Sequence, residues 1–206
     1  VNWKQGEQCV AQGKATVWPA RYAHNWVDEA DVAHSEMLTA TRVLEPADCP
    51  GLIYYIPTPK SPHGVDVDPS GEFFAAGGKL AAIVPVFAFS KLQQAIAGKA
   101  FDKELNGIPV LKYESVLSCE VRDNPGLGPL HTEFDANGNG YTAMFLSSEI
   151  TKWRVKDCAV LDRIPVYYSI GHLLVPGGDT RQPDGKYVIA LNKITKDRYL
   201  PTGPEL

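Results

Sequence analysis

The sequence predicts an all-β fold, a partial β-propeller of about three blades with one short inserted helix. From Gly51 onward, short runs of β-branched and aromatic residues alternate with glycine, proline and aspartate. This pattern is typical of antiparallel strands joined by tight turns. One order of features also occurs three times: a histidine that opens a strand, a glycine-containing turn, and an aromatic-rich strand. A unit repeated in this way indicates a propeller.

The expected elements follow from these runs and from helix-end residues. The inserted helix is expected at residues 91–97, because Ser90 suits an N-cap and Gly98 suits the position after the last turn. Residues 1–50 are assigned to an N-terminal part of the propeller region, with helix-compatible spacing at 3–14, and residues 51–206 to consecutive blades. The expected strands are residues 52–56, 64–67, 72–76, 83–89, 140–146, 149–155, 164–168 and 186–191.

The three repeats contain most of the histidines of the chain. The first runs from His63 to a turn at Gly71, and the second runs from His131 to Gly138. The third begins at His172 and reaches its turn, after an insertion, at Gly185. Each turn glycine is expected to adopt the positive φ that a tight hairpin requires. The intervals between successive histidines bracket the roughly 40 to 50 residues of a four-stranded blade.

Histidines at equivalent blade positions are expected to converge, because the innermost strand of every blade lines the central channel. Neutral imidazole suits copper, zinc, iron and nickel, and histidines without a carboxylate at the same repeat position favour copper. Alternation along the first strand places Asp66 and Asp68 on the face opposite His63. These carboxylates are therefore expected to point away from the histidines. His24 and His34 lie outside the repeats and are interpreted as structural or surface residues.

Composition excludes several classes of function. The chain of 206 residues has 44% hydrophobic and 21% charged residues, which is ordinary for a globular protein. A net charge of -4 and the absence of a basic cluster predict no nucleic-acid binding. The longest apolar run, residues 80–89, is shorter than the roughly 18 to 20 residues of a membrane span, so no membrane insertion is expected.

The four cysteines show no CxxC spacing, which argues against a zinc knuckle or a thioredoxin-type pair. They are Cys9, Cys49, Cys119 and Cys158. We interpret them as small buried side chains, while one or two disulfides stay open as an alternative in an oxidising compartment.

Several motifs resemble nitrous-oxide reductase, over about residues 53–206. Two are highly specific, residues 126–132 (GLGPLHT) and residues 196–201 (KDRYLP). Residues 173–180 are similar to the more divergent branch of that family. The other matching segments are residues 61–65, 77–80, 138–142, 171–172 and 193–195.

The resemblance implies an oxidoreductase of denitrification: a seven-bladed propeller with a histidine-bound four-copper sulfide cluster, at which nitrous oxide is reduced to dinitrogen and water. It places His63, His131 and His172 at three cluster-ligand positions, and Lys193 beside the cluster or at a calcium site. It also implies calcium, periplasmic localisation, a homodimer and an electron donor such as a c-type cytochrome or a cupredoxin. The dinuclear copper of the family belongs to a cupredoxin domain, which is absent from this sequence.

The chain is expected to be an internal segment, because Val1 is not a methionine and the last residues stop in what reads as a loop. Three histidines cannot complete the cluster, so the isolated segment is expected to be inactive. One alternative is a non-catalytic β-propeller binding module whose histidines only close hydrogen bonds at strand starts. Another is a propeller lyase or lactonase that uses calcium or iron and needs carboxylates at its channel.

Overall fold

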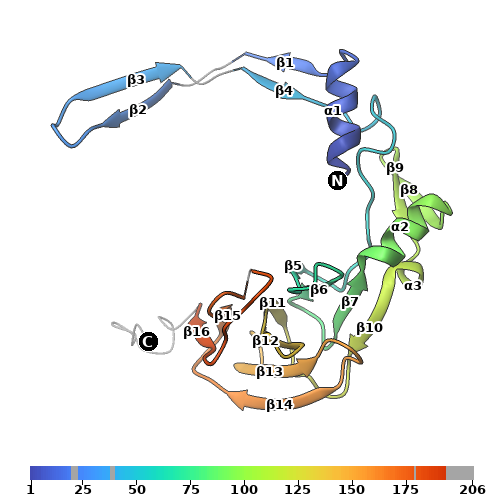
Figure 1. The fold of residues 1–206 in the computed structure, drawn as a ribbon, viewed down its shortest axis with the longest axis vertical. Helices are drawn as coiled ribbons and strands as arrows, with labels where there is room; N and C mark the ends of the chain where they lie inside the picture. The colour runs from blue at the N-terminus through green and yellow to red at the C-terminus, as the bar shows by residue number, and fades with distance from the viewer. Residues whose placement is uncertain (20–22, 38–39, 179, 194–206) are drawn as a thin grey trace. The chain divides into compact units, whose positions relative to one another are not determined.

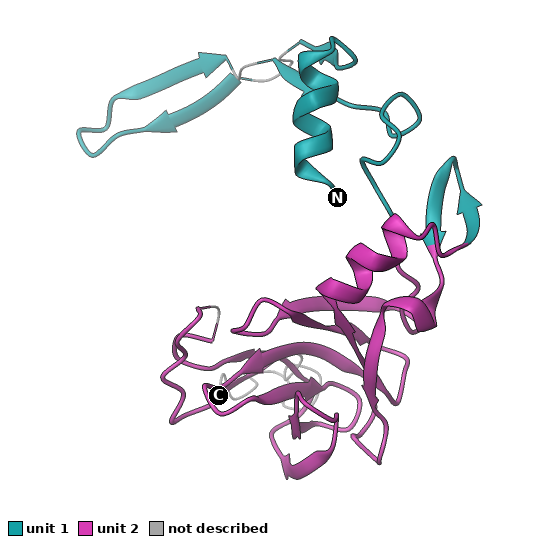
Figure 2. Cartoon of the chain, turned by 45° about the vertical axis from the view of Figure 1, so that its right-hand side comes forward, with its two compact units in different colours: residues 1–55, 102–110 teal, residues 56–101, 111–206 magenta. Residues whose placement is uncertain are grey.

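The structure is a computed structural model that describes residues 1–19, 23–37, 40–178 and 180–193, and most of its elements are short antiparallel strands (Figure 1). The chain divides into two compact units (Figure 2). The first comprises Val1–Tyr55 and Asp102–Val110, and the second comprises Ile56–Phe101 and Leu111–Leu206. The expectation of an all-β partial propeller is confirmed, and its blades lie in the second unit.

The first blade is a four-stranded antiparallel sheet in the order β5 (Pro62–Val67), β6 (Phe73–Gly78), β7 (Val84–Ala88) and β10 (Leu117–Val121). The hairpin between β5 and β6 turns where the sequence predicts it. The Asp68 carboxylate accepts the backbone N–H of Phe73 at 2.8 Å. Gly71 has a φ of 74° with open space around it, so glycine is needed there for its backbone conformation.

An insertion separates β7 from β10. It contains α2 (Phe89–Ala97), β8 (Phe101–Leu105), β9 (Ile108–Leu111) and α3 (Tyr113–Val116). Gly98 ends α2 as expected, but the N-cap is Ala88, and Ser90 lies inside the first turn. The prediction for Ser90 is wrong because its hydroxyl and its backbone N–H both donate to the Glu72 carboxylate, which lies far away in the sequence.

The second blade is a simple meander of β11 (Pro129–Phe134), β12 (Asn139–Met144), β13 (Glu149–Arg154) and β14 (Val160–Pro165). Its first turn contains Gly138 with a φ of 75°, as predicted. The third blade is represented by one hairpin, β15 (Ile170–Leu174) paired with β16 (Ile189–Asn192). Gly185 does not adopt positive φ, and Gly177 does so instead at 70°, so the predicted position of this turn is wrong.

Two buried clusters join the blades. Burial alternates along β13, so Trp153 faces the first blade while its strand neighbours do not. The Trp153 ring lies 6.0 Å from the Phe134 ring, and its indole N–H donates to the Thr142 hydroxyl at 2.8 Å. Ile170 and Leu173 of β15 pack against the second blade in the same way. Because each sheet is covered by the next, the first strands of the three blades, β5, β11 and β15, lie in neighbouring positions (Figure 1).

The first unit is built differently. Its helix α1 (Trp3–Ala11) confirms the helix-compatible spacing and is capped by Asn2, whose side chain accepts the Gln5 N–H at 3.2 Å. Its strands form two-stranded pairs, β1 (Thr16–Trp18) with β4 (Thr41–Val43) and β2 (Ala23–Val27) with β3 (Ala33–Met37). Residues 52–56, expected as a strand, make only a single bridge through Tyr55. None of the described helices has the length and apolarity needed to cross a membrane.

All four cysteines are paired, as Cys9–Cys49 and Cys119–Cys158. Their interpretation as unlinked buried side chains is therefore wrong, and the disulfide alternative is correct. The partners are 40 and 39 residues apart, and spacing of that length gives no local sign of pairing.

Candidate metal centre

Three histidines that are far apart in the sequence lie together in the second unit. His63 is on β5, His131 on β11 and His172 on β15, the first strands of successive blades. Their ring centroids are 5.0 Å apart for His63 and His131, 4.8 Å for His131 and His172, and 6.5 Å for His63 and His172. We call these three residues the histidine cluster. The structure brings together the side chains that the repeats single out, and their role as ligands stays a prediction.

Glycines allow the blades to approach closely enough for the rings to meet. A Cβ on Gly64 would lie 2.5 Å from the Leu130 carbonyl oxygen and 2.7 Å from Nδ1 of His131. A Cβ on Gly77 of β6 would also collide with the Leu130 carbonyl. Because glycine has no Cβ, β5 and β6 can lie directly against the backbone of β11. These two positions explain why the motif His63-Gly64 requires a glycine after the histidine.

Lys193 reaches the cluster from the end of β16. Its backbone N–H donates to the Ser169 carbonyl at 2.9 Å, and its aliphatic stem lies where a Cβ on Gly171 would be. Its Nζ lies 3.0 Å from Nε2 of His63. An ammonium group only donates hydrogen bonds, so Nε2 of His63 accepts and its proton is on Nδ1. The rest of the motif at residues 193–201 lies outside the described residues.

Asp66 also lies beside the cluster, which contradicts the expectation from strand alternation. Its Oδ2 accepts the backbone N–H of Thr132 at 2.7 Å, and its Oδ1 lies 3.4 Å from Nδ1 of His131. The face opposite His63 is the one that meets the next blade, where His131 is located. A register shift between Pro62 and Val65 further disturbs the alternation. No pattern within β5 alone indicates this contact.

The electrostatics favour the neutral form of two imidazoles of the cluster, those of His63 and His172. Removal from water lowers the pKa of His63, and the positive charge of Lys193 lowers that pKa further. Removal from water is also the largest cause that lowers the pKa of His172, followed by the charges of His131 and Lys193, while Asp66 opposes the shift. A neutral imidazole retains the lone pair with which histidine binds metals.

The donor set fits copper held by several histidines. Within the part of the chain that the structure describes, no three histidine, cysteine or carboxylate side chains surround the position of a single ion. The rings of His131 and His172 are stacked with 23° between their planes, so they lie side by side and do not converge on one atom. A group that contains several metal atoms does not require its ligands to meet at one atom.

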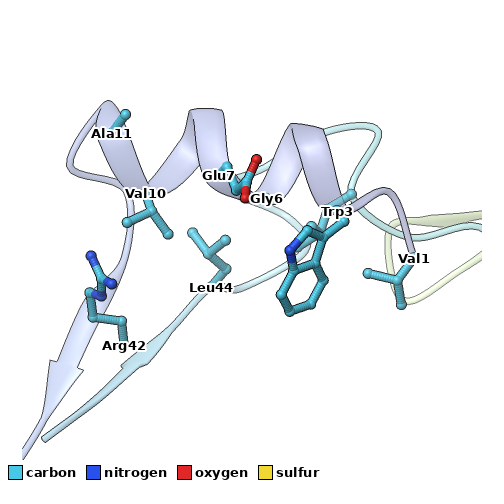
Figure 3. A pocket seen from close by; sticks show the side chains of 9 residues that line it. Val1, Trp3, Gly6, Glu7, Val10, Ala11, Arg42 and Leu44 are labelled. Atoms are coloured by element: carbon cyan, nitrogen blue, oxygen red, sulfur yellow. The ribbon is translucent and has the colours of Figure 1, made fainter.

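Two other features, both in the first unit, show no comparable chemistry. A pocket of about 720 Å³ is formed by α1 and β4, and Val10, Leu44 and Trp3 are directed toward it (Figure 3). Its lining is mostly apolar and contains no histidine. His24 and His34 flank Trp26 on the β2–β3 hairpin, with centroid distances of 4.9 and 5.1 Å. They do not belong to the histidine cluster.

Comparisons with known proteins give one consistent result. A family model described as a nitrous oxide reductase propeller repeat matches residues 163–206. The nitrous-oxide reductase of Stutzerimonas stutzeri is 37% identical over 160 residues, which is 73% of this chain and 23% of that protein. That of Ralstonia nicotianae is 36% identical over 165 residues, covering 74% and 24%. The chain thus spans about a quarter of the length of these relatives.

Among solved structures, a hydrazine synthase from Kuenenia stuttgartiensis aligns with a TM-score of 0.47 and 10% sequence identity. The alignment covers 69% of this chain and 32% of that one. This likeness is too low to support an inference about the fold or the function.

Proposed function

Because the chain belongs to the nitrous-oxide reductase family, as a segment of its propeller region, we propose that the histidine cluster supplies copper ligands to the site of nitrous oxide reduction. The observation that carries the proposal is the convergence of His63, His131 and His172 with centroids 4.8 to 6.5 Å apart. Each imidazole comes from the first strand of a different blade, so a group of several metal atoms at this place could contact all three.

The three histidines and Lys193 would have different roles at this site. The three imidazoles would hold copper atoms of a four-copper sulfide cluster, since nitrogen ligands suit copper. When bound, this group would supply the redox chemistry in which nitrous oxide, two electrons and two protons give dinitrogen and water. The ammonium of Lys193 would stabilise negative charge that develops on the substrate oxygen at the edge of the site. Its present hydrogen bond to Nε2 of His63 supports this place for the side chain, and the backbone carbonyl of Lys193 would be the group available to calcium.

Lys193 would also have to release His63 before copper binds through Nε2. That nitrogen has one lone pair, which cannot serve an ammonium proton and a metal atom together. The aliphatic stem of Lys193 lies against Gly171, so the side chain can turn away without a bulky neighbour at that position.

The wider setting of the proposal rests on family membership. We propose a periplasmic enzyme of denitrification, and the two disulfides support an oxidising compartment. Calcium, a homodimer, a cupredoxin domain with dinuclear copper, and a c-type cytochrome or cupredoxin as electron donor belong to the same proposal. The remaining cluster ligands would come from other parts of the reductase, so residues 1–206 alone would be inactive.

Alanine variants of the complete reductase test the proposed ligands. We expect His131→Ala to lower copper content and to reduce nitrous oxide turnover more than about 100-fold, since loss of a ligand exceeds the effect of losing an orienting group. The matched control is His24→Ala, which removes an imidazole from the first unit. Copper is measured by elemental analysis and turnover with a reduced electron donor. Full copper content and normal turnover in His131→Ala would contradict the proposal.

A second candidate function is a non-catalytic binding module. The observation that favours it is that His63 and His131 already have polar partners, Lys193 and Asp66. This candidate predicts that the unmodified complete protein binds no copper at the histidine cluster and that turnover is absent. Copper analysis of the unmodified protein therefore decides between the two candidates.

A further inference from the structure

Asp66 joins two successive residues of a strand in a different blade. β5 and β11 belong to separate four-stranded sheets, yet Oδ2 of Asp66 accepts the Thr132 N–H at 2.7 Å. Thr132 is 3% exposed, so its backbone donor is buried and the carboxylate supplies its partner. Through this bond the Asp66 side chain is held at a defined place on β11.

The same carboxylate faces one particular edge of the His131 ring. Oδ1 of Asp66 lies 3.4 Å from Nδ1 of His131, and a Cβ on Gly64 would lie 2.7 Å from that nitrogen. The Nδ1 edge of the ring is therefore packed against β5. A partner that does not belong to β5 would therefore have to reach the ring through its second nitrogen, Nε2.

A carboxylate at this position determines which nitrogen carries the proton. A carboxylate only accepts hydrogen bonds, and a neutral imidazole has one N–H. The 3.4 Å separation is longer than a usual hydrogen bond, but the negative charge beside Nδ1 also stabilises a proton on that nitrogen. Both effects favour the tautomer with the proton on Nδ1 and a free lone pair on Nε2. Metal-binding histidines commonly donate their second N–H to a carboxylate in this way.

We infer that Asp66 is a positioning residue for His131, which holds the imidazole in the tautomer that binds copper through Nε2. The inference deepens the proposed function and rests on it, because the tautomer matters for copper only if His131 is a ligand. It also assigns a role to the contact between two blades, since the orienting group comes from β5 and the oriented ring from β11.

The variant Asp66→Asn distinguishes the positioning of His131 from the structural role of Asp66, which is to accept the Thr132 N–H. The Thr132 N–H requires an acceptor, so the amide oxygen of Asn would take the place of Oδ2 and retain the bond between the blades. The amide NH₂ would then face Nδ1 of His131 as a donor. Nδ1 would have to accept, and the proton would move to Nε2. Asp66→Asn is thus expected to fold normally while presenting the wrong tautomer.

The experiment uses the complete reductase in unmodified form, as Asp66→Asn, and as Asp162→Asn. Asp162 is an exposed residue of β14 and gives the same change of charge without contact to the cluster. Nitrogen NMR of histidine-labelled, metal-free protein reports the tautomer of His131, and copper titration reports affinity. We expect Asp66→Asn to move the His131 proton from Nδ1 to Nε2 and to weaken copper binding by about 10- to 100-fold. The control should match the unmodified protein in both measurements.

The outcomes distinguish the inference from the function on which it rests. If the unmodified protein binds copper and Asp66→Asn keeps both the tautomer and the affinity, the inference about Asp66 is wrong and the proposed function stands. If the unmodified protein binds no copper, the proposed function fails, and a tautomer shift in Asp66→Asn would still support the positioning of the ring. A variant that unfolds would overturn the positioning role in favour of a purely structural one.

Discussion

The two units of the chain reach stability in different ways. In the second unit, four-stranded sheets cover one another, and large side chains such as Trp153 and Phe134 are fully buried between them. In the first unit, the Cys9–Cys49 disulfide is at the centre of a small buried cluster with Leu52, against which Leu44 and Ile53 pack. Two-stranded pairs bury too little surface to be stable alone. In the second unit, packing between successive sheets therefore fixes the positions of the side chains. In the first unit, a disulfide cross-link has this role.

The difference extends to exposed apolar surface. Trp3, Trp18 and Met37 of the first unit are 76%, 58% and 60% exposed. In the second unit, Tyr187 is also exposed, but Trp153, Phe87 and Phe134 are each no more than 2% exposed. Substitution of a large apolar residue is therefore expected to lower the free energy of unfolding strongly in the second unit and only slightly in the first.

The largest expected difference concerns two tryptophans. Trp153→Ala should lower the free energy of unfolding by about 3–5 kcal/mol, because it opens a cavity and leaves the Thr142 hydroxyl without its indole partner. Trp26→Ala, at a side chain that is 39% exposed on the β2–β3 hairpin, should lower it by no more than about 1 kcal/mol. Chemical denaturation followed by circular dichroism measures both. Equal losses would show that the first unit has a core of comparable strength.

Removal of each disulfide is the next test. The double variants Cys9→Ser with Cys49→Ser and Cys119→Ser with Cys158→Ser open loops of nearly equal length, 40 and 39 residues. Each should lower the free energy of unfolding by about 2–4 kcal/mol. Only the first should expose residues 1–55 to limited proteolysis, because the blades retain a core of valines and aromatic residues. Protection of residues 1–55 after loss of Cys9–Cys49 would contradict this.

The smallest expected difference concerns the aspartates at two hairpin turns. Asp135 accepts backbone N–H groups of Asn137 and Asn139 at 2.8 and 3.0 Å and the Tyr141 hydroxyl at 2.9 Å. Burial alone would raise the pKa of Asp135, but these hydrogen bonds outweigh it and lower the pKa. Asp28 of the β2–β3 turn also has a lowered pKa, chiefly through its hydrogen bond with His34, but it is exposed.

The sign of the pH dependence follows from these shifts. Because the folded pKa of Asp135 is below the unfolded value of about 3.9, its stabilisation is complete above that value and is lost as the pH falls through the folded pKa. Asp135→Asn should therefore lower stability by about 1–2 kcal/mol at pH 7 and flatten its fall below pH 4. Asp28→Asn should change the profile less, because water screens an exposed charge. Unfolding measured from pH 2 to pH 7 tests both variants, and equal profiles would contradict the comparison.

Local sequence is sufficient to predict a turn or a helix end where the contacts that stabilise it lie within a single hairpin or helix. Gly71 and Gly138 were predicted as turn glycines and have φ values of 74° and 75°. The helix before Gly98 was predicted for the same reason, since its residues interact with their own neighbours. Ser90 was assigned wrongly because its partner, Glu72, belongs to another element.

The sequence by itself determined the repeats, the turn glycines Gly71 and Gly138 and the three histidines that open equivalent strands, because alternation and turn conformation act over a few adjacent residues. Only the tertiary structure decided which groups surround those histidines. Asp66 meets His131, and Lys193 meets His63, across boundaries between blades. The pairing of the four cysteines was decided in the same way. The physical reason is that these contacts join elements far apart in the sequence, so they depend on how closely those elements pack. Glycines such as Gly64 permit the close packing, but no local sequence pattern indicates which side chains then meet.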